Sequence, residues 1–160
     1  MAIDPRLSLR PAEATDKQAI LTMINAMADV DKMPRLDDQA QQRLLRDAFD
    51  KKRFFIMLAE WEGKPIGYAA YFEAYSTFEA RPTLFIDDLF VQPEYRGRHV
   101  AYELFREMMR EAKRRDCGRM DWLVLESNQG AFGFYDHLRA NRLNDWTPFR
   151  LLRADIDRMV

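Results

Sequence analysis

Apolar positions along the chain repeat with two different periods, and the change from one period to the other predicts the order of the elements. The repeat is helical over residues 20–27, where the apolar positions are Ile20, Met23, Ile24 and Met27. Thr15 and Gln18 lie three residues apart just before this stretch, which predicts a capping box at the helix start. A second helix is expected over residues 37–49, with Ala40, Leu44, Leu45 and Ala48 on its buried side.

Short apolar runs predict the strands. Residues 54–59 and 66–72 are two such runs, and the turn at Gly63 between them predicts a hairpin. A loop containing Phe78 precedes the next strand. The expected strands cover residues 8–11, 54–59, 66–72, 84–91 and 120–125, with a closing strand over 146–152 beside a partner near 141–144.

A long amphipathic helix is expected over residues 98–115. Its inner stripe is Val100, Leu104, Met108 and Ala112, charged residues that include Glu103 cover the other side, and Gly118 is expected to cap its end. A shorter helix follows a turn and holds Phe132, Phe134 and Tyr135. The order predicts an α/β (α+β) fold with a single mixed, mostly antiparallel sheet of six to seven strands flanked by about four helices.

Length and composition place the chain among globular proteins. Its 160 residues are expected to form one domain, residues 1–160, with residues 1–6 as a flexible leader. The single cysteine, Cys117, favours a reducing, cytoplasmic setting. The chain has no apolar run of ~18 residues and no signal-peptide pattern, so no membrane partner is expected. His99 and His137 lack cysteine partners at ligand spacing, so no metal site is expected.

A basic turn separates the strand over residues 84–91 from the long helix. It reads Arg96-Gly97-Arg98-His99-Val100-Ala101. The first N–H groups of a helix have no partner within the helix and the dipole is positive there, so such a turn can hold a phosphate. An ordinary strand-to-helix loop with solvated arginines fits the same pattern.

Asp87 and Asp88 interrupt an otherwise apolar strand. Adjacent strand residues face opposite sides of a sheet, so one carboxylate is expected on each side unless a bulge reorients them. Pairing with an arginine or capping of a backbone group would also explain each of them. In the functional interpretation they bind a protonated amine and Asp87 accepts its proton as general base, because an alkyl ammonium keeps its proton up to roughly pH 10.

The turn and the element order resemble the GNAT family of N-acetyltransferases. The family's pyrophosphate loop has the pattern Arg/Gln-x-x-Gly-x-Gly/Ala; Arg96 and Ala101 match its ends, and His99 stands at its middle glycine. The residues before the turn, Val91-Gln92-Pro93-Glu94-Tyr95, are also similar to the family's. The resemblance covers residues 9–152 and implies a GNAT-type sheet with acetyl-CoA as the acetyl donor.

The resemblance also implies a role for each part of the site. The pyrophosphate of acetyl-CoA is implied to lie on the turn, and its pantetheine arm along the strand from Asp88 to Val91. The implied cofactor-binding residues are Leu89, Phe90, Val91, Arg96, Gly97, Arg98, His99, Val100, Ala101, Asn128, Phe132 and Tyr135. Tyr135 is implied to protonate the departing CoA thiolate, and core packing is the alternative interpretation. Arg139-Ala140 stands where the family has a glycine shortly after this tyrosine.

The spermidine/spermine N-acetyltransferase-like branch resembles the chain most. Residues 86–91 are similar to its Glu-Asp-Phe-Phe-Val strand, with Asp87 in place of the glutamate. Carboxylates attract ammonium groups and aromatic rings cover methylenes, so a polyamine, diamine or lysine-like substrate is expected. The residues expected on the substrate side are Asp31, Asp87, Asp88, Phe78, Glu126 and Trp146. Tyr71 is a further aromatic candidate, for which core packing is the alternative.

Three other functions fit parts of the sequence. They are a CoA-binding module with weak or no catalysis, an acetyltransferase of amino acids or peptide N-termini, and a nucleic-acid binder through Arg106, Arg110, Lys113, Arg114 and Arg115. Interleaved glutamates and the net charge of −1 argue against nucleic acid as a partner. The family usually dimerises, so a homodimer through residues 146–152 is expected.

Overall fold

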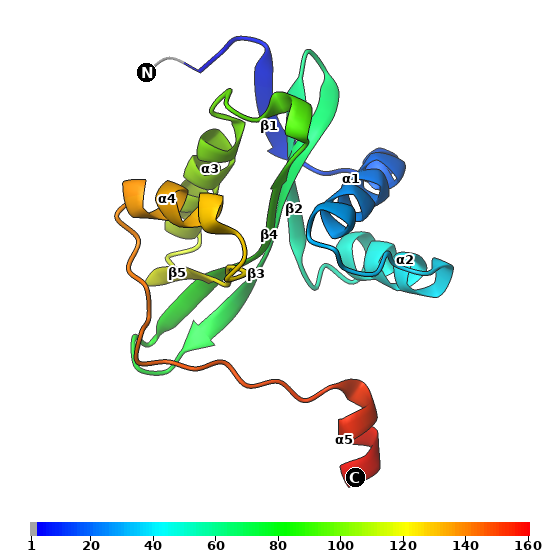
Figure 1. The fold of residues 1–160 in the computed structure, drawn as a ribbon, viewed down its shortest axis with the longest axis vertical. Coiled ribbons are helices and arrows are strands. Elements are labelled where there is room, and N and C mark those ends of the chain that lie inside the picture. The colour runs from blue at the N-terminus through cyan, green and yellow to red at the C-terminus, as the bar shows by residue number, and fades with distance from the viewer. Residues whose placement is uncertain (1–2) are drawn as a thin grey trace. The chain divides into compact units, whose positions relative to one another are not determined.

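The computed structural model describes residues 3–160, which contain a five-stranded sheet. Figure 1 shows how its strands are arranged. The strand order is β1-β2-β3-β4-β5, antiparallel except for the parallel pair β4–β5. The strands are β1 Leu7–Pro11, β2 Phe55–Trp61, β3 Lys64–Ser76, β4 Arg81–Val91 and β5 Arg119–Trp122. This mixed sheet confirms the predicted fold class.

The described chain divides into two compact units at Leu123–Val124. The first unit holds the sheet and helices α1 Lys17–Val30, α2 Asp38–Leu45 and α3 Val100–Arg114. The second holds α4 Gln129–His137 and α5 Arg153–Met159. Met1 and Ala2 of the expected leader lie outside the described residues; within it, Arg6 donates to Asp4 Oδ2 at 2.8 Å.

Within the first unit, helices cover both faces of the sheet (Figure 1). The α1 face carries the core cluster Ile20, Met23, Ile56, Leu58, Tyr68, Ala70 and Phe90. On the α3 face, the predicted stripe of Val100, Leu104, Met108 and Ala112 is buried as expected. Glu103 was expected among the exposed charges but is only 6% exposed, because it lies in the first turn of α3, next to the sheet.

Two backbone turns show why the sequence folds locally as it does. Glu62 and Gly63, between β2 and β3, both have positive φ (52° and 80°), as a two-residue hairpin turn requires. At the end of α3 the left-handed residue is Asp116 (φ 53°), and the Cys117 N–H donates to Ala112 O at 2.9 Å. The predicted Gly118 cap is therefore wrong: Asp116 takes the left-handed position two residues earlier.

The start of the first helix also differs from its prediction. A short 3-10 turn, Ala14–Asp16, precedes α1, and the Glu13 N–H donates to Asp16 Oδ2 at 2.7 Å. The capping box expected at Thr15 and Gln18 is wrong, because the box forms two residues earlier, between Glu13 and Asp16. The second predicted helix is confirmed as α2 followed by a π-helical turn, Arg46–Asp50.

The predicted strands near residues 141–144 and over 146–152 do not form. The described sheet has five strands rather than six to seven, β5 ends at Trp122, and the last regular element is a helix, α5. Residues 141–152 make no strand pairing among the described residues, and Trp146 and Phe149 are 73% and 95% exposed. An apolar run forms a strand only where it pairs with another strand, and residues 141–152 pair with none of the described strands.

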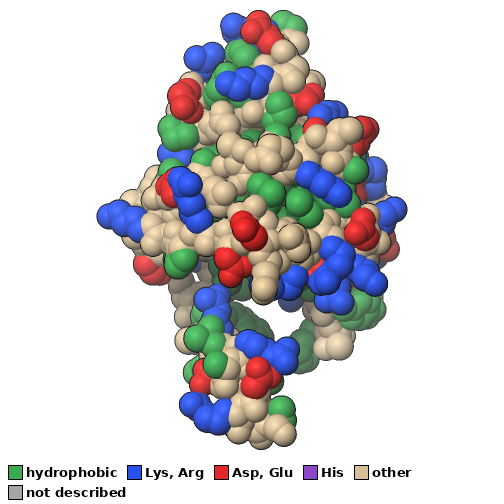
Figure 2. All heavy atoms as spheres, turned by 90° about the vertical axis from the view of Figure 1, so that its right-hand side faces the viewer, with side chains coloured by type: hydrophobic (Ala, Val, Ile, Leu, Met, Phe, Trp, Pro, Cys, Tyr) green, Lys and Arg blue, Asp and Glu red, His purple; other side chains and the backbone are tan. Residues whose placement is uncertain are grey.

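Charged side chains of both signs lie intermixed over the face that carries α1 and α2 (Figure 2). None of the helices in residues 3–160 is long and apolar enough to cross a membrane.

Candidate active site

A β-bulge in β4 orients the two adjacent carboxylates. Ala70 of β3 opposes Asp88, whereas Tyr71 opposes Ile86, so Asp87 is the extra residue on β4. A bulge removes the strict alternation of faces. Sequence alone left the orientation of Asp87 and Asp88 open, and the bulge settles it: the side chain of Asp88 reaches Tyr68 on the α1 face.

Asp88 is a partly buried acid with an altered proton affinity. Its Oδ2 accepts a hydrogen bond from Tyr68 Oη at 3.3 Å. The pKa of Asp88 is raised to about 6, chiefly by burial and also by the charges of Asp87 and Asp31, while the hydrogen bond from Tyr68 opposes the rise. Such a carboxyl can gain and lose a proton near neutral pH, as a general base must.

Tyr68 is the fully buried neighbour of this acid. Its side chain is 0% exposed, and its Oη lies 3.5 Å from Met27 Sδ of α1 as well as 3.3 Å from Asp88. Burial, with the charge of Asp88 added, raises the pKa of Tyr68 far above the ordinary value for a phenol. The residue therefore stays neutral and acts as a hydrogen-bond donor.

The edge of β4 beyond the bulge is unpaired on the β5 side. β5 pairs only with Thr83 to Ile86, whereas β3 pairs with β4 as far as Val91. Backbone groups of residues 87–91 that point toward β5 thus have no strand partner among the described residues. Amide groups of a ligand can bind an unpaired edge of this kind, as an added strand would.

The basic turn between β4 and α3 contains two residues with left-handed backbones. Gly97 has φ 75° and His99 has φ 61°, and His99 is the N-cap of α3. Alternating right- and left-handed residues at a helix start aim N–H groups into an anion-binding hollow. Arg96 Nε donates to Val91 O at 3.1 Å, which fixes the corner where the strand enters the turn.

Arg98 stacks on aromatic rings. Its guanidinium carbon lies 5.2 Å from the ring centre of Trp61 and 5.5 Å from that of Tyr95. Arg6 lies over Trp61 at 4.6 Å, so cations from two segments flank this ring. Arg98 and His99 line a surface hollow beside the start of α3.

The second unit carries the remaining predicted cofactor residues. Asn128 caps α4 by accepting from the Ala131 N–H at 3.3 Å. Burial raises the pKa of Tyr135, whose ring centre lies 5.1 Å from that of Phe134. Arg142 lies over the ring of Phe132 at 4.4 Å and 3.9 Å from Glu126 Oε1. The structure thus brings the acids and the turn into one unit, and Tyr135, Asn128, Phe132, Glu126 and Trp146 into the other.

The other predicted substrate residues of the first unit differ in their surroundings. Asp31 follows α1 directly, and its charge acts on both Asp88 and Tyr68. Phe78 is 96% exposed in the turn between β3 and β4. Tyr71 is 4% exposed, with its ring 5.7 Å from that of Phe55 and Arg115 over both rings, so core packing explains it.

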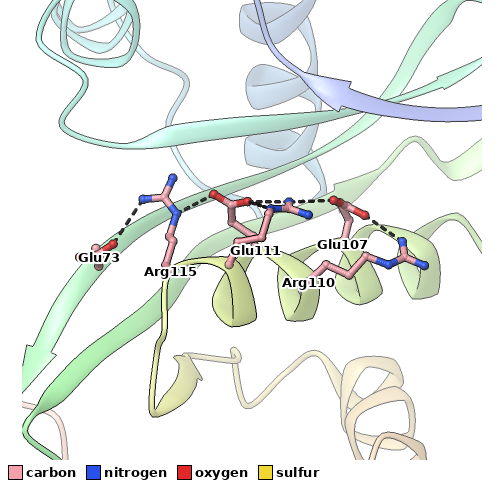
Figure 3. Close-up of polar contacts among 6 residues, drawn as sticks. Glu73, Glu107, Arg110, Glu111 and Arg115 are labelled. Atoms are coloured by element: carbon pink, nitrogen blue, oxygen red, sulfur yellow. Dashed lines mark hydrogen bonds and ion pairs between the residues drawn. The ribbon is translucent and has the colours of Figure 1, made fainter.

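The arginines proposed for nucleic acid are engaged in ion pairs along α3 (Figure 3). Arg115 lies between Glu111 Oε1 at 2.6 Å and Glu73 Oε2 at 3.4 Å. The remaining pairs are Arg106–Glu103, Arg110–Glu107, Arg114–Glu107 and Arg114–Glu111. This pairing leaves less free positive charge for a phosphate backbone.

Known proteins resemble both the sequence and the fold. The model of the Acetyltransferase (GNAT) family matches residues 21–139 of the chain. The chain belongs to the GNAT family. This GNAT protein is 27% identical to the thialysine N-epsilon-acetyltransferase of Mus musculus over 154 residues, covering 89% of this chain and 90% of the mouse protein.

Two further comparisons agree. The chain is 28% identical to the spermidine/spermine N(1)-acetyltransferase-like protein 1 of Homo sapiens, over 92% of this chain and 23% of the human protein. An integron cassette protein of V. cholerae superposes with a TM-score of 0.82 at 16% identity, over 98% of both chains, which shows the fold alone. The family and these relatives confirm that this GNAT chain is an N-acetyltransferase and that the predicted branch was correct.

Three neighbours of the site could not be predicted from the sequence: Tyr68, Met27 and Trp61. Tyr68 stands in a predicted strand, but nothing in the sequence indicates that its hydroxyl reaches Asp88. The bulge at Asp87 decides that geometry, and a bulge leaves no reliable mark in a single sequence.

Proposed function

We propose that this N-acetyltransferase moves an acetyl group from acetyl-CoA directly to a primary amine of a small cationic substrate, namely a polyamine, diamine or lysine-like compound. The observation that carries the proposal is the partly buried Asp88 at the β4 bulge, directly before the unpaired edge of that strand. An amine bound at the acid and a ligand bound along the edge would be neighbours.

The names of the relatives support this substrate class. The proteins of Mus musculus and Sus scrofa are thialysine N-epsilon-acetyltransferases, and a protein of Arabidopsis thaliana is an L-ornithine N5-acetyltransferase. The human relative is spermidine/spermine-like. These names all refer to amines on alkyl chains. The thialysine relatives are matched over 89% of this chain, so a lysine-like side chain is the first substrate to test.

The donor fits the residues of the first unit. GNAT acetyltransferases in general use acetyl-CoA, which supplies an acetyl thioester. The unpaired edge at Leu89, Phe90 and Val91 can bind the amide groups of the pantetheine arm through its backbone. The phosphates would be held by N–H groups of the turn and of α3 at Val100 and Ala101. Asn128 and Phe132, which belong to the second unit, are also among the residues proposed to bind acetyl-CoA.

Asp88 is the proposed proton acceptor for the amine. The ammonium must lose a proton before or as its nitrogen bonds to the acetyl carbon, and a charged carboxylate within reach can take that proton. Asp87, the acid that the sequence favoured as base, is exposed; we place it with Asp31 as a partner for the ammonium charge. Phe78, Glu126 and Trp146 remain candidates for covering the rest of the substrate.

Tyr135 is the proposed acid for the departing thiolate. Because burial raises its pKa, the phenol holds its proton throughout the neutral range. Replacement by phenylalanine keeps the ring and removes the proton, so Tyr135→Phe should lower kcat about 10²-fold with little change in the Kd for CoA. An unchanged kcat across pH would remove Tyr135 from this role, and Tyr75→Phe, at an exposed tyrosine of β3, is the matched control.

A second copy of the chain is the proposed partner of residues 146–152. Trp146, Phe149, Leu151 and Leu152 are 73%, 95%, 63% and 63% exposed. Apolar side chains gathered in one segment at this exposure are typical of an interface. We therefore retain the predicted homodimer as a proposal.

One assay tests the proposed reaction. CoA release is measured with acetyl-CoA and thialysine, ornithine, spermidine, free amino acids and a peptide N-terminus. Asp88→Asn should lower kcat/KM for cationic amines about 10²-fold, whereas Asp50→Asn, at an exposed acid outside the site, should not change it. Turnover of none of these amines would contradict the proposal, and an equal loss for cationic and neutral amines would remove Asp88 from amine handling.

A further inference from the structure

The Tyr68 hydroxyl lies between two acceptors on different elements. Asp88 Oδ2 of β4 is 3.3 Å away and Met27 Sδ of α1 is 3.5 Å away. A phenol has one proton, so it can donate to only one of them at a time. The hydroxyl is enclosed in the core, where an unsatisfied polar group is costly.

The protonation state of Asp88 decides which acceptor is used. A charged Asp88 only accepts, so Tyr68 donates to it. Once Asp88 carries a proton, that O–H can donate to the Tyr68 oxygen, and the Tyr68 proton is then free to turn toward the Met27 sulfur. The hydroxyl keeps a partner in both states, although a thioether is the weaker acceptor of the two.

We propose that Tyr68 is a positioning residue that holds the Asp88 carboxylate in its charged, proton-accepting form, and that Met27 is the alternative acceptor which lets Asp88 take up a proton without leaving the buried hydroxyl unpaired. The role in the reaction rests on the proposed function, in which Asp88 receives the proton of the amine. The hydrogen-bond exchange itself does not depend on activity.

Other charges act on the same carboxyl and must stay constant in a test. Asp87, beside it on β4, and Asp31, after α1, both raise the pKa of Asp88, and the hydroxyl of Tyr68 faces it from β3. Tyr68→Phe removes only the donor and keeps the ring that contacts Phe90. Met27→Leu keeps the volume and removes only the sulfur acceptor.

The first experiment measures the pKa of Asp88 directly. The carbon-13 resonance of its carboxyl group, which is assigned by its loss in Asp88→Asn, is titrated in the 160-residue chain. Tyr68→Phe should raise this pKa by about one pH unit, because a hydrogen bond to the charged form is lost. Met27→Leu should lower it by a smaller amount, because the protonated form loses its second acceptor, and Tyr75→Phe should not move it.

These directions are opposite, so each part can fail separately. An unchanged or lowered pKa in Tyr68→Phe would overturn the positioning role. An unchanged or raised pKa in Met27→Leu would overturn the exchange of acceptors. A general loosening of the core would move both variants in the same direction and would also contradict the proposal.

The second experiment connects the contact to turnover. In Tyr68→Phe, the acid limb of the pH profile of kcat/KM for the best amine should shift to higher pH together with the pKa of Asp88. The plateau value of kcat/KM at high pH should change less than threefold. A moved pKa with an unmoved limb would overturn the role in the reaction. If the unaltered protein turns over no amine, the proposed function fails, and the titration still decides whether Tyr68 controls Asp88.

Discussion

Asp88 is charged at a position where burial disfavours charge. Its pKa of about 6 results chiefly from burial, with Asp87 and Asp31 adding to it. The folded protein therefore binds a proton at this site more readily than the unfolded chain does. Residues tuned for proton transfer often carry such a cost in stability.

Asp88→Asn should therefore stabilise the fold at neutral pH while impairing turnover. A raised carboxyl pKa contributes stability that is complete below the unfolded value of 3.8 and is lost as the pH rises through about 6. Because asparagine does not ionise, the substitution should raise the free energy of unfolding by roughly 2–3 kcal/mol near pH 8, and by much less near pH 4. Denaturant unfolding at both pH values checks this, and a gain of equal size at both would contradict it.

His99 occupies a backbone conformation that suits glycine. Its φ of 61° costs roughly 1–2 kcal/mol for a residue with a Cβ atom. His99→Gly should raise the free energy of unfolding by about 0.5–1 kcal/mol, because glycine's greater freedom in the unfolded chain offsets part of the relief. It should also leave the Kd for CoA unchanged or lower, as measured by calorimetry. Weaker CoA binding would instead indicate that the imidazole itself contacts the ligand.

At the scale of elements, the pairing of β3 with β4 positions the site. Gly67 opposes Val91, and a Cβ atom placed on Gly67 would lie 2.7 Å from Phe90 O. The two strands therefore approach closely at the stretch of β4 that is proposed to bind the pantetheine arm. Three residues further along β3, opposite Ala70, β4 bulges, and Asp87 is left out of the strand pairing.

Gly67→Ala should disturb that edge. The added methyl group forces the Phe90 carbonyl to move, so we expect a loss of about 1–3 kcal/mol in the free energy of unfolding and a raised Kd for CoA. Gly133→Ala is the control, since a Cβ atom there meets nothing within 4 Å and α4 should gain about 0.5–1 kcal/mol. Unfolding curves and CoA titrations of both variants test this. Equal changes in stability and in the Kd for CoA would contradict the close approach of Gly67 to the Phe90 carbonyl.

At the scale of the whole molecule, the residues proposed for the reaction belong to two compact units. The acids, the turn and the unpaired edge belong to residues 3–123, and Tyr135 belongs to residues 124–160. The second unit also carries a series of exposed apolar side chains near the end of the chain, among them Phe149, which is 95% exposed. Self-association is the proposed use of that segment.

Phe149→Ser should weaken self-association. Loss of a buried aromatic contact in an interface typically costs about 2–4 kcal/mol, which corresponds to a dimer Kd raised roughly 30-fold or more. Sedimentation over a range of concentrations measures this. Phe78→Ser removes an equally exposed ring, 96% exposed, from the first unit and should leave the association unchanged. A protein that is monomeric at every concentration would contradict the proposed homodimer.

Much of the element order could be predicted from local sequence patterns. The stripe from Val100 to Ala112 and the hairpin turn at Gly63 follow from spacing and from one permissive backbone position. The failures share one cause, which is that the deciding partner lies elsewhere in the molecule. The apolar run at residues 146–152 pairs with no strand, and the charge of Glu103 is buried because α3 packs its first turn on the sheet.

The sequence by itself determined the family, the basic turn and the pair of acids, because each is a matter of residue type at fixed spacing. Only the tertiary structure decided that a bulge sends Asp88 toward Tyr68, that β5 stops at Trp122 and leaves β4 an open edge, and that Asp88 titrates near pH 6. The physical reason is that strand register, burial and the field of neighbouring charges depend on residues brought together from β3, β4 and α1. Local periodicity carries no information about those distances.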